Sequence, residues 1–266
     1  MPLRVTQCDD PPRCQGYAWH VRSEQFLAQL VARLVLGHYR HVARVLREAR
    51  GTVPVPEASE IDRAIQDLAP PGKDEYRWHR DGWVFQMISW IAAHVTADGE
   101  VAASIPHPRK TAKGFDAVIV QVAASGNDLT GVIICEDKAT ENSRQTIREQ
   151  VWPDFEDIEA GKRDRELRSE VTAILERYRP QNVDELVKRI HWDSQRRYRV
   201  AITIGDTHNS QEGRSRLFRG YSKKVRGGLE RRRGETFHLV DLRSWMDHFC
   251  ELVVLEIESM RSHEDV

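Results

Sequence analysis

The chain has 266 residues, of which 40% are hydrophobic and 30% are charged, and it contains seven Trp. This much apolar surface can build a core, which excludes a chain that is disordered throughout. The length suits one large domain, or one domain with an appendage, because single cores seldom grow beyond roughly 250–300 residues. Forty Lys and Arg nearly balance 41 Asp and Glu, for a formal charge of −1. A uniformly basic, histone-like binder is therefore excluded as well.

The apolar segments are too short to cross a membrane. The most apolar run, residues 83–95, is shorter than the roughly 18 residues that a spanning helix needs. The N-terminal sequence MPLRVTQCDDPPRC lacks the apolar stretch of a secretory signal, so we expect a cytoplasmic protein. The four Cys show no CxxC spacing, which argues against a disulfide framework. A zinc site from Cys8, Cys14 and His20 stays an alternative, although its spacing matches no common ligand pattern.

The first part of the chain has the periodicity of helices. Apolar residues recur at three- and four-residue steps over residues 23–50, and shorter helices fit residues 60–68 and 75–97. The last of these is apolar around most of its circumference, so we expect it to be buried against a sheet. We therefore predict an N-terminal helical segment over residues 1–74 and a main domain over residues 75–266.

Short Val- and Ile-rich runs alternate with helical segments in the main domain. Strands are expected at residues 114–124, 129–138, 197–204 and 235–240. Helices are expected at 141–159, from the break at Gly161 up to 178, at 183–191 and at 242–260. This alternation predicts an α/β fold with a mixed central sheet flanked by helices, preceded by an N-terminal helical extension.

The first two strands form a hairpin that carries the chemically informative residues. If the loop is residues 126–128, Asp116 lies opposite Lys138 and diagonal to Glu136. These three side chains then share one face of the sheet, and Asp137 points to the other face. A loop one residue shorter would turn Asp116 away, so the prediction depends on the parity of the register.

Two carboxylates and an ammonium group beside apolar strands are costly to bury unless a cation or mutual pairing offsets their charge. The simplest interpretation is a metal site. Asp116 and Glu136 offer the oxygen ligands that Mg²⁺ (or Mn²⁺) prefers, and Lys138 is placed to orient or deprotonate an attacking water. Such a site hydrolyses phosphodiesters.

At these residues the sequence resembles the PD-(D/E)XK nuclease superfamily. The motif of that family is an Asp on one strand and Glu-X-Lys on the next, matched here by Asp116 and the triplet Glu136-Asp137-Lys138. Phe115 stands where many members have Pro. The resemblance implies a restriction-endonuclease-like fold, metal binding by Asp116 and Glu136, and support of the attacking water by Lys138.

The resemblance also implies polar groups on the helices around the hairpin. Many members place a Glu or Gln on the preceding helix near the metal, and Gln86 is the candidate here. A buried, hydrogen-bonded glutamine without a role in the site is the alternative. On the following helix, Gln145 or Gln150 is a candidate for a further polar contact.

A basic stripe provides a candidate surface for nucleic acid. Residues 214–233 contain nine basic residues and one acidic residue, with Phe218 and Tyr221 as candidate stacking surfaces. A solvated charged face is the alternative. We predict contacts to nucleic acid from Arg214, Arg216, Arg219, Lys223, Lys224, Arg231, Arg232 and Arg233. The loop before Asp116 adds His107, Arg109, Lys110 and Lys113 near the expected metal site.

These features predict a Mg²⁺-dependent nuclease, acting on DNA rather than RNA, and by analogy serving restriction or antiviral defence. The sequence has no GxxxxGK[ST] loop and no GxGxxG turn, so coupling to ATP would require a partner ATPase or helicase. Association with a second copy of the chain is an open possibility. The runner-up is a non-catalytic nucleic-acid-binding or adaptor protein with a nuclease-like fold, and a hydrolase or transferase acting on a small molecule is a third interpretation.

Overall fold

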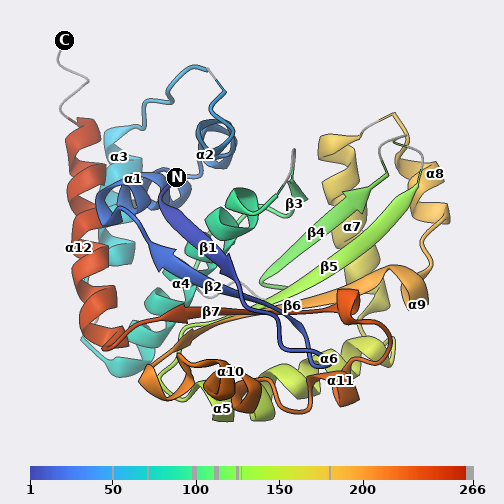
Figure 1. The fold of residues 1–266 in the computed structure, drawn as a ribbon. Coiled ribbons are helices and arrows are strands. Elements are labelled where there is room, and N and C mark those ends of the chain that lie inside the picture. Colours follow the sequence, from blue (N-terminus) through green and yellow to red (C-terminus); the bar gives the residue numbers. More distant parts are fainter. Residues whose placement is uncertain are drawn as a thin grey trace.

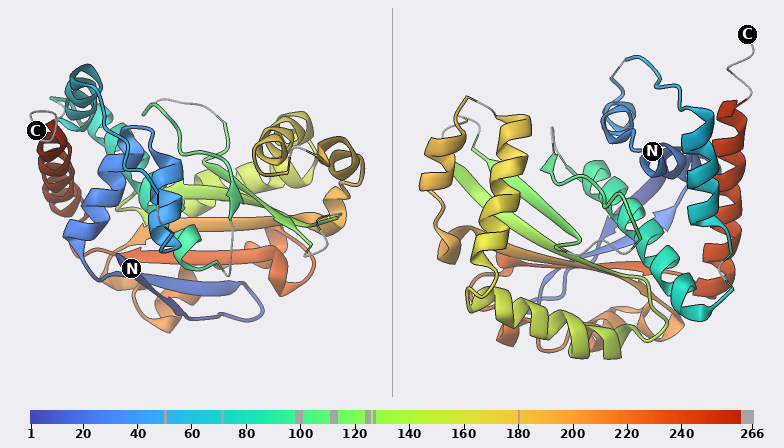
Figure 2. Two further views of the ribbon diagram at one scale, coloured as in Figure 1. Left: turned by 90° about the horizontal axis from the view of Figure 1, so that it is seen from above. Right: turned by 180° about the vertical axis from the view of Figure 1, so that it is seen from behind.

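The fold is built on one curled, mixed sheet of seven strands, shaped like half of a barrel (Figures 1 and 2). The computed structural model describes residues 1–49, 51–70, 72–97, 101–110, 114–123, 126, 128–179 and 181–261. The strand order is β1-β2-β7-β6-β5-β4-β3. The strands are β1 (Leu3–Gln7), β2 (Gln15–Val21), β3 (Ala102–Ala103), β4 (Ala117–Val122), β5 (Leu129–Lys138), β6 (Arg196–Ile204) and β7 (Arg232–His238).

Parallel pairing in the centre of the sheet gives way to antiparallel pairing at both sides. Strands β2, β7, β6 and β5 run parallel to one another, whereas β1 pairs antiparallel with β2. On the other side β4 pairs antiparallel with both β5 and β3. Of the two strands of the expected hairpin, β5 therefore belongs to the parallel centre and β4 lies beside it.

Helices cover both faces of the sheet. The described helices are α1 (Glu24–Val35), α2 (Tyr39–Leu46), α3 (Ala58–Leu68), α4 (Asp74–Val95), α5 (Ser143–Thr146), α6 (Trp152–Glu159), α7 (Asp164–Tyr178), α8 (Val183–Lys188), α9 (Trp192–Gln195), α10 (Gln211–Leu217), α11 (Tyr221–Lys224) and α12 (Leu242–Arg261). A π-helical turn, η1 (Ile147–Val151), joins α5 to α6, and η2 (Asp206–His208) and η3 (Leu229–Arg231) are 3₁₀ turns.

Each face of the sheet has its own core. One core joins α1, α3, α4 and α12 to side chains such as Ala201 and Phe237. The other joins α6, α7 and α11 to Val200, Ile202 and their neighbours on β4 and β5. Successive residues of a strand alternate between these two cores, as the pleat of a sheet requires. The expected mixed sheet flanked by helices is confirmed in this coarse form.

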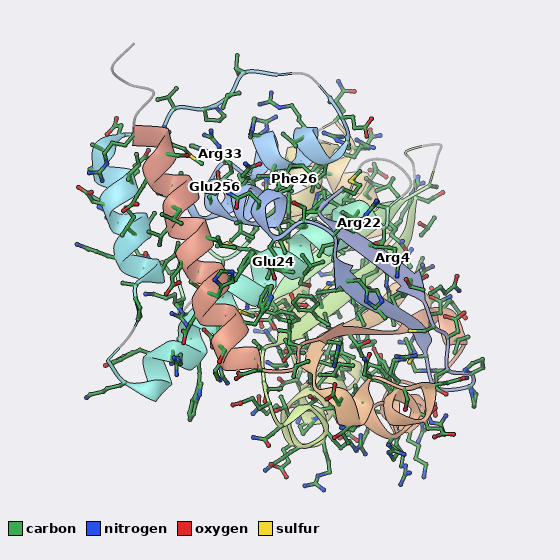
Figure 3. All side chains as sticks on the ribbon, turned by 60° about the vertical axis from the view of Figure 1, so that its left-hand side comes forward. Arg4, Arg22, Glu24, Phe26, Arg33 and Glu256 are labelled. Carbon is green, nitrogen blue, oxygen red and sulfur yellow. The ribbon has the colours of Figure 1, made fainter. Side chains whose placement is uncertain are left out.

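The N-terminal helices pack against the last helix of the chain. Figure 3 shows Arg33 of α1 beside Glu256 of α12. Below this pair, Trp245 Nε1 of α12 donates a hydrogen bond to Glu24 Oε1 of α1 at 2.8 Å. Phe26 of α1 packs against the same core. The two ends of the chain therefore stabilise each other.

The N-terminus begins with strands, so the expected N-terminal helical extension is wrong in this respect. Strands β1 and β2 form an antiparallel pair, and β2 continues the sheet alongside β7. The alternation was missed because β1 is an edge strand whose polar residues face the solvent, leaving Leu3 as its fully buried member. The boundary at residues 74 and 75 stays a prediction, although the sheet and one core cross it.

Other differences from the predicted elements have local causes. The helix expected over residues 23–50 is interrupted at Gly37, which has a φ of 76° and ends α1. The helix expected over 141–159 contains the π turn η1. Strand β7 begins at Arg232, three residues before the expected start. Part of the basic stripe therefore belongs to the central sheet.

A buried ionic network joins α4 to the centre of the sheet. Arg199 of β6 is 2% exposed, and its Nη2 donates to Glu235 Oε2 of β7 at 2.8 Å. Its Nη1 donates to Ser89 Oγ of α4 at 2.8 Å and lies 3.7 Å from Asp137 Oδ1 of β5. Arg233 also pairs with Glu235. Burial alone would raise the pKa of Glu235, but attraction to the two arginines outweighs it and lowers the pKa to about 2.

We expect Glu235→Gln to lower the free energy of unfolding by about 3 kcal/mol at neutral pH, because it leaves a buried arginine without its charge partner. The folded-state pKa lies below the ordinary 4.5, so this stabilisation is present above pH 4.5 and is lost as the pH falls toward 2. Urea unfolding at several pH values measures the difference. The exposed Glu258→Gln is the control, with a change within about 0.5 kcal/mol. Equal stability of Glu235→Gln and the native protein at pH 7 would contradict this account.

Candidate metal and phosphodiester site

The hairpin brings Asp116 next to Glu136. Ala117 pairs with Cys135, so the register places Asp116 beside Glu136 and not opposite Lys138. The expected three-residue loop is wrong, because Ala123 N–H bonds to the carbonyl of Asp128 and the register shifts between Gln121 and Val122. At Asp116 the observed pairing differs from the expected pairing by two residues, so the parity that the prediction required is kept.

Three polar side chains meet at this end of the hairpin. Lys138 Nζ lies 3.1 Å from Glu136 Oε2 and 4.0 Å from Asp116 Oδ2. The backbone N–H of Asp137 donates to Asp116 Oδ2 at 2.8 Å. Asp116 is therefore held by the main chain of β5, and it faces Glu136 across a single ammonium group.

Helix α4 contributes the fourth group. Gln86 Nε2 donates to Asp116 Oδ1 at 2.5 Å, so the glutamine expected from the sequence lies at Asp116. One turn further along α4, Ser89 Oγ donates to Asp137 Oδ1 at 2.7 Å. The triplet at the end of β5 is thus divided. Glu136 and Lys138 face the site, and Asp137 joins the buried network that clamps α4 and Gln86 in place.

The two carboxylates are held in an unfavourable environment. Burial, and then repulsion from Asp116, raises the pKa of Glu136 to about 7 in spite of Lys138. Burial also raises the pKa of Asp116 to about 6, although Lys138 opposes the shift. Burial would lower the pKa of Lys138, but the two carboxylates outweigh it and raise this pKa. One ammonium group thus faces two carboxylates, of which Glu136 is buried and Asp116 is half-buried, and a further cation would balance the remaining charge.

The donor set fits a hard divalent cation. Mg²⁺ is commonly held by one or two carboxylates together with waters and substrate phosphates, and Asp116 and Glu136 supply two carboxylates on neighbouring strands. Within the described part of the chain, no group of three or more His, Cys, Asp or Glu side chains is arranged to hold a metal ion. A site here would therefore take most of its ligands from water and substrate, and the zinc alternative at Cys8, Cys14 and His20 receives no support.

A cleft opens beside Lys138. This cavity of about 400 Å³ is lined by Lys138, by Gln145 and Gln150 after β5, and by Arg243 of α12. Gln145 Nε2 donates to Glu149 Oε2 at 2.9 Å on the same wall. Trp78 of α4 forms the rim and is 58% exposed. Trp78 was not among the residues predicted from the sequence. The signal that could have found it is a large aromatic residue on the polar first turns of a helix that is otherwise buried.

The basic stripe does not form one surface. Arg232 is buried, and its guanidinium donates to backbone carbonyls of Arg13, Val225 and Gly227. Arg231 pairs with Glu159, and Lys224 pairs with Glu156.

The aromatic residues of the basic stripe are buried, whereas some of its cations are exposed. Phe218 and Tyr221 are buried in the core, so the expectation that they stack on bases is wrong. Arg216, Arg219 and Lys223 remain exposed, whereas Arg214 is half-buried. Repulsion from Arg219 and Arg148 contributes, after burial, to a lowered pKa of Arg144, so these three cations lie near one another. Arg148 also pairs with Glu149 at 2.6 Å. The usable positive surface is therefore smaller than the stripe and includes residues of α5 and η1.

The loop before Asp116 is only partly described. Lys110 Nζ pairs with Asp67 at 3.0 Å, and the carbonyl of His107 accepts a hydrogen bond from Trp83. Arg109 is exposed. Lys113 lies outside the described residues. None of these contacts reaches Asp116.

Comparisons with models of known protein families, with curated proteins and with solved structures give no match to this chain. Among the described helices, none has the length and apolar character that a bilayer crossing requires.

Removing the charge of Glu136 is expected to stabilise the metal-free protein. The folded-state pKa is raised, so the native protein loses stability as the pH rises from 4.5 through about 7. Glu136→Gln removes this loss and should be more stable at pH 8 by on the order of 2 kcal/mol, with little difference near pH 4.5. Urea unfolding after metal removal measures it, with the exposed Glu176→Gln as the control. A Glu136→Gln protein less stable than the native one at pH 8 would show that the carboxylate is well accommodated.

Proposed function

We propose that this chain is a divalent-metal-dependent nuclease that hydrolyses phosphodiester bonds, with DNA as its substrate. The observation that supports this most is the convergence of Asp116, Glu136, Lys138 and Gln86 at one end of the hairpin, where two carboxylates share one ammonium group. Groups that are costly to a fold and gathered beside a cleft are typical of functional sites. The resemblance to the PD-(D/E)XK superfamily rests on the same residues.

Each residue has a distinct part in the proposed reaction. Asp116 and Glu136 would hold Mg²⁺ or Mn²⁺. When bound, the ion would supply electrostatic stabilisation of the phosphate and a water of lowered pKa. Lys138 remains protonated at neutral pH, so its Nζ holds and orients a water and stabilises negative charge that develops on the phosphate. Gln86 fixes the orientation of the Asp116 carboxylate through its 2.5 Å hydrogen bond.

The surroundings of the cleft support a nucleic-acid substrate. Arg144, Arg148 and Arg219 lie near one another and would contact backbone phosphates. Trp78 offers an exposed ring on which a base can stack. A backbone that enters past Trp78 would meet Lys138, because both line the same cavity.

We place this nuclease in the cytoplasm, in restriction or antiviral defence, as part of the same proposal. The sequence carries no nucleotide-binding loop of the common types, so a partner ATPase or helicase would supply any energy coupling. A second copy of the chain is a further possible partner.

A non-catalytic nucleic-acid-binding or adaptor protein is the second candidate. Two observations favour it: Lys138 lies 3.1 Å from Glu136 in an ion pair, and a glutamine occupies the position on α4 where a carboxylate would strengthen metal binding. The same surface would then hold nucleic acid without cutting it.

Cleavage assays separate the two candidates. We expect supercoiled and linear DNA to be cut with Mg²⁺ or Mn²⁺, and Glu136→Gln and Lys138→Met to lose at least about 100-fold in rate, because each removes a group that acts at the reacting phosphate. Glu176→Gln, folded and remote, should cut like the native protein. The same cleavage assays with RNA as the substrate show which polymer is cut. DNA binding without cutting, by a protein that also binds no metal, would favour the adaptor.

A further inference from the structure

A second cavity lies on the concave face of the sheet, apart from the candidate site. Its volume is about 540 Å³, within the range of small-molecule pockets. Residues of β3, β4, β5, β6 and β7 line it, among them Gln121 and Arg197, and one wall is formed by Ala93 of α4 and by Thr96, which follows this helix. Glu136 and Lys138 face the other side of the sheet, nearer the opposite end of the β4–β5 pair.

Arginines dominate the polar part of this cavity. Arg197, Arg199 and Arg233 line it from β6 and β7, and Arg179 lines it from the end of α7. Arg199 and Arg233 share Glu235, and Arg199 also faces Asp137. The hydrogen bonds of Arg197 go to neutral groups: Nη1 donates to Gln121 Oε1 at 2.6 Å and Nη2 to the carbonyl of Thr130 at 2.9 Å. Among the described residues, no carboxylate is paired with the charge of Arg197.

Two of these arginines are held in place by hydrogen bonds within the protein. Arg197 is fixed by Gln121 and by the carbonyl of Thr130. Arg199 is 2% exposed and fixed on three sides, so its position is preorganised.

The sheet also leaves room for the Arg197 guanidinium. A Cβ at Gly131 would lie 2.6 Å from Gln121 Oε1 and 3.0 Å from Arg197 Cζ. The glycine therefore allows Arg197 and Gln121 to lie flat on the floor of the cavity. An alanine there would displace these two flexible side chains rather than the backbone.

We propose that this cavity binds a small molecule through a phosphate or carboxylate group. The planar fork of arginine matches both groups, and Arg197 has no carboxylate partner among the described residues that would compete with a bound anion. Apolar residues on the remaining walls, including Val101, Ile119 and Val122, would contact the body of the ligand. This proposal does not depend on the proposed nuclease activity.

Calorimetric titration of the full chain tests the proposal in metal-free buffer prepared with a chelating resin. The probes are pyrophosphate and adenosine 5′-monophosphate for phosphate groups, and citrate for carboxylates. We expect saturable binding of at least one probe, and its identity decides between the two groups. Affinity should fall at least about tenfold in Arg197→Gln and in Gly131→Ala, which retains every charge. Arg226→Gln removes an exposed arginine and should leave affinity unchanged.

Thermal unfolding of each variant establishes that it is folded before titration. Absence of saturable binding of all three probes to the native protein would overturn the proposal, and so would binding that Arg197→Gln leaves unchanged. A short single-stranded DNA is titrated as well. Binding of the DNA alone, without any small anion, would also overturn it, because the arginines would then serve a polymer. Cleavage is not part of the readout, so failure here leaves the nuclease proposal standing.

Discussion

The buried charge of Arg199 is the constraint on which the rest of the structure depends. A fully buried guanidinium is tolerated only when its charge and donors are matched, and Glu235, Asp137 and Ser89 provide the match. These partners come from β7, β5 and α4, so one residue fixes the helix on the sheet. Gln86 lies one turn from Ser89, and its contact with Asp116 follows from this clamp. The network that stabilises the fold thus also positions the candidate site.

The two sides of the Glu136-Asp137-Lys138 triplet differ in how their charges are balanced. Asp137 faces the buried Arg199, whereas Glu136 and Asp116 share one lysine. Burial raises the pKa of all three carboxyl groups, so the two faces differ in the number of cations and not in the direction of these shifts. A fold selected for stability alone would not keep such carboxylates together. This contrast between a balanced face and an unbalanced face supports a functional interpretation of the site, and the Arg197 cavity shows the opposite imbalance on the concave face.

The sequence predicted what local patterns encode. The bounds of β5 were predicted correctly, and Asp116 was expected on the face of Glu136 because this depends only on whether the register is odd or even. The exact partner of Asp116 was wrong, because the loop length also depends on the bulge near Val122. Strand β1 was missed because its exposed edge hides the alternation. The burial of Arg199 and Arg232 could not be predicted from the sequence, because their partners lie on distant segments. A count of charges along the chain does not say where the side chains point.

Metal binding by the native protein and by Asp116→Asn tests the central claim most directly. The variant keeps the size of the side chain and the contact with Gln86 while it removes one of the two carboxylates. We predict that calorimetry detects Mn²⁺ and Mg²⁺ binding to the native protein, that Asp116→Asn abolishes it, and that exposed Glu176→Gln binds like the native protein. No binding to the native protein, or binding that survives in Asp116→Asn, would contradict the account of Asp116 and Glu136 as a metal site.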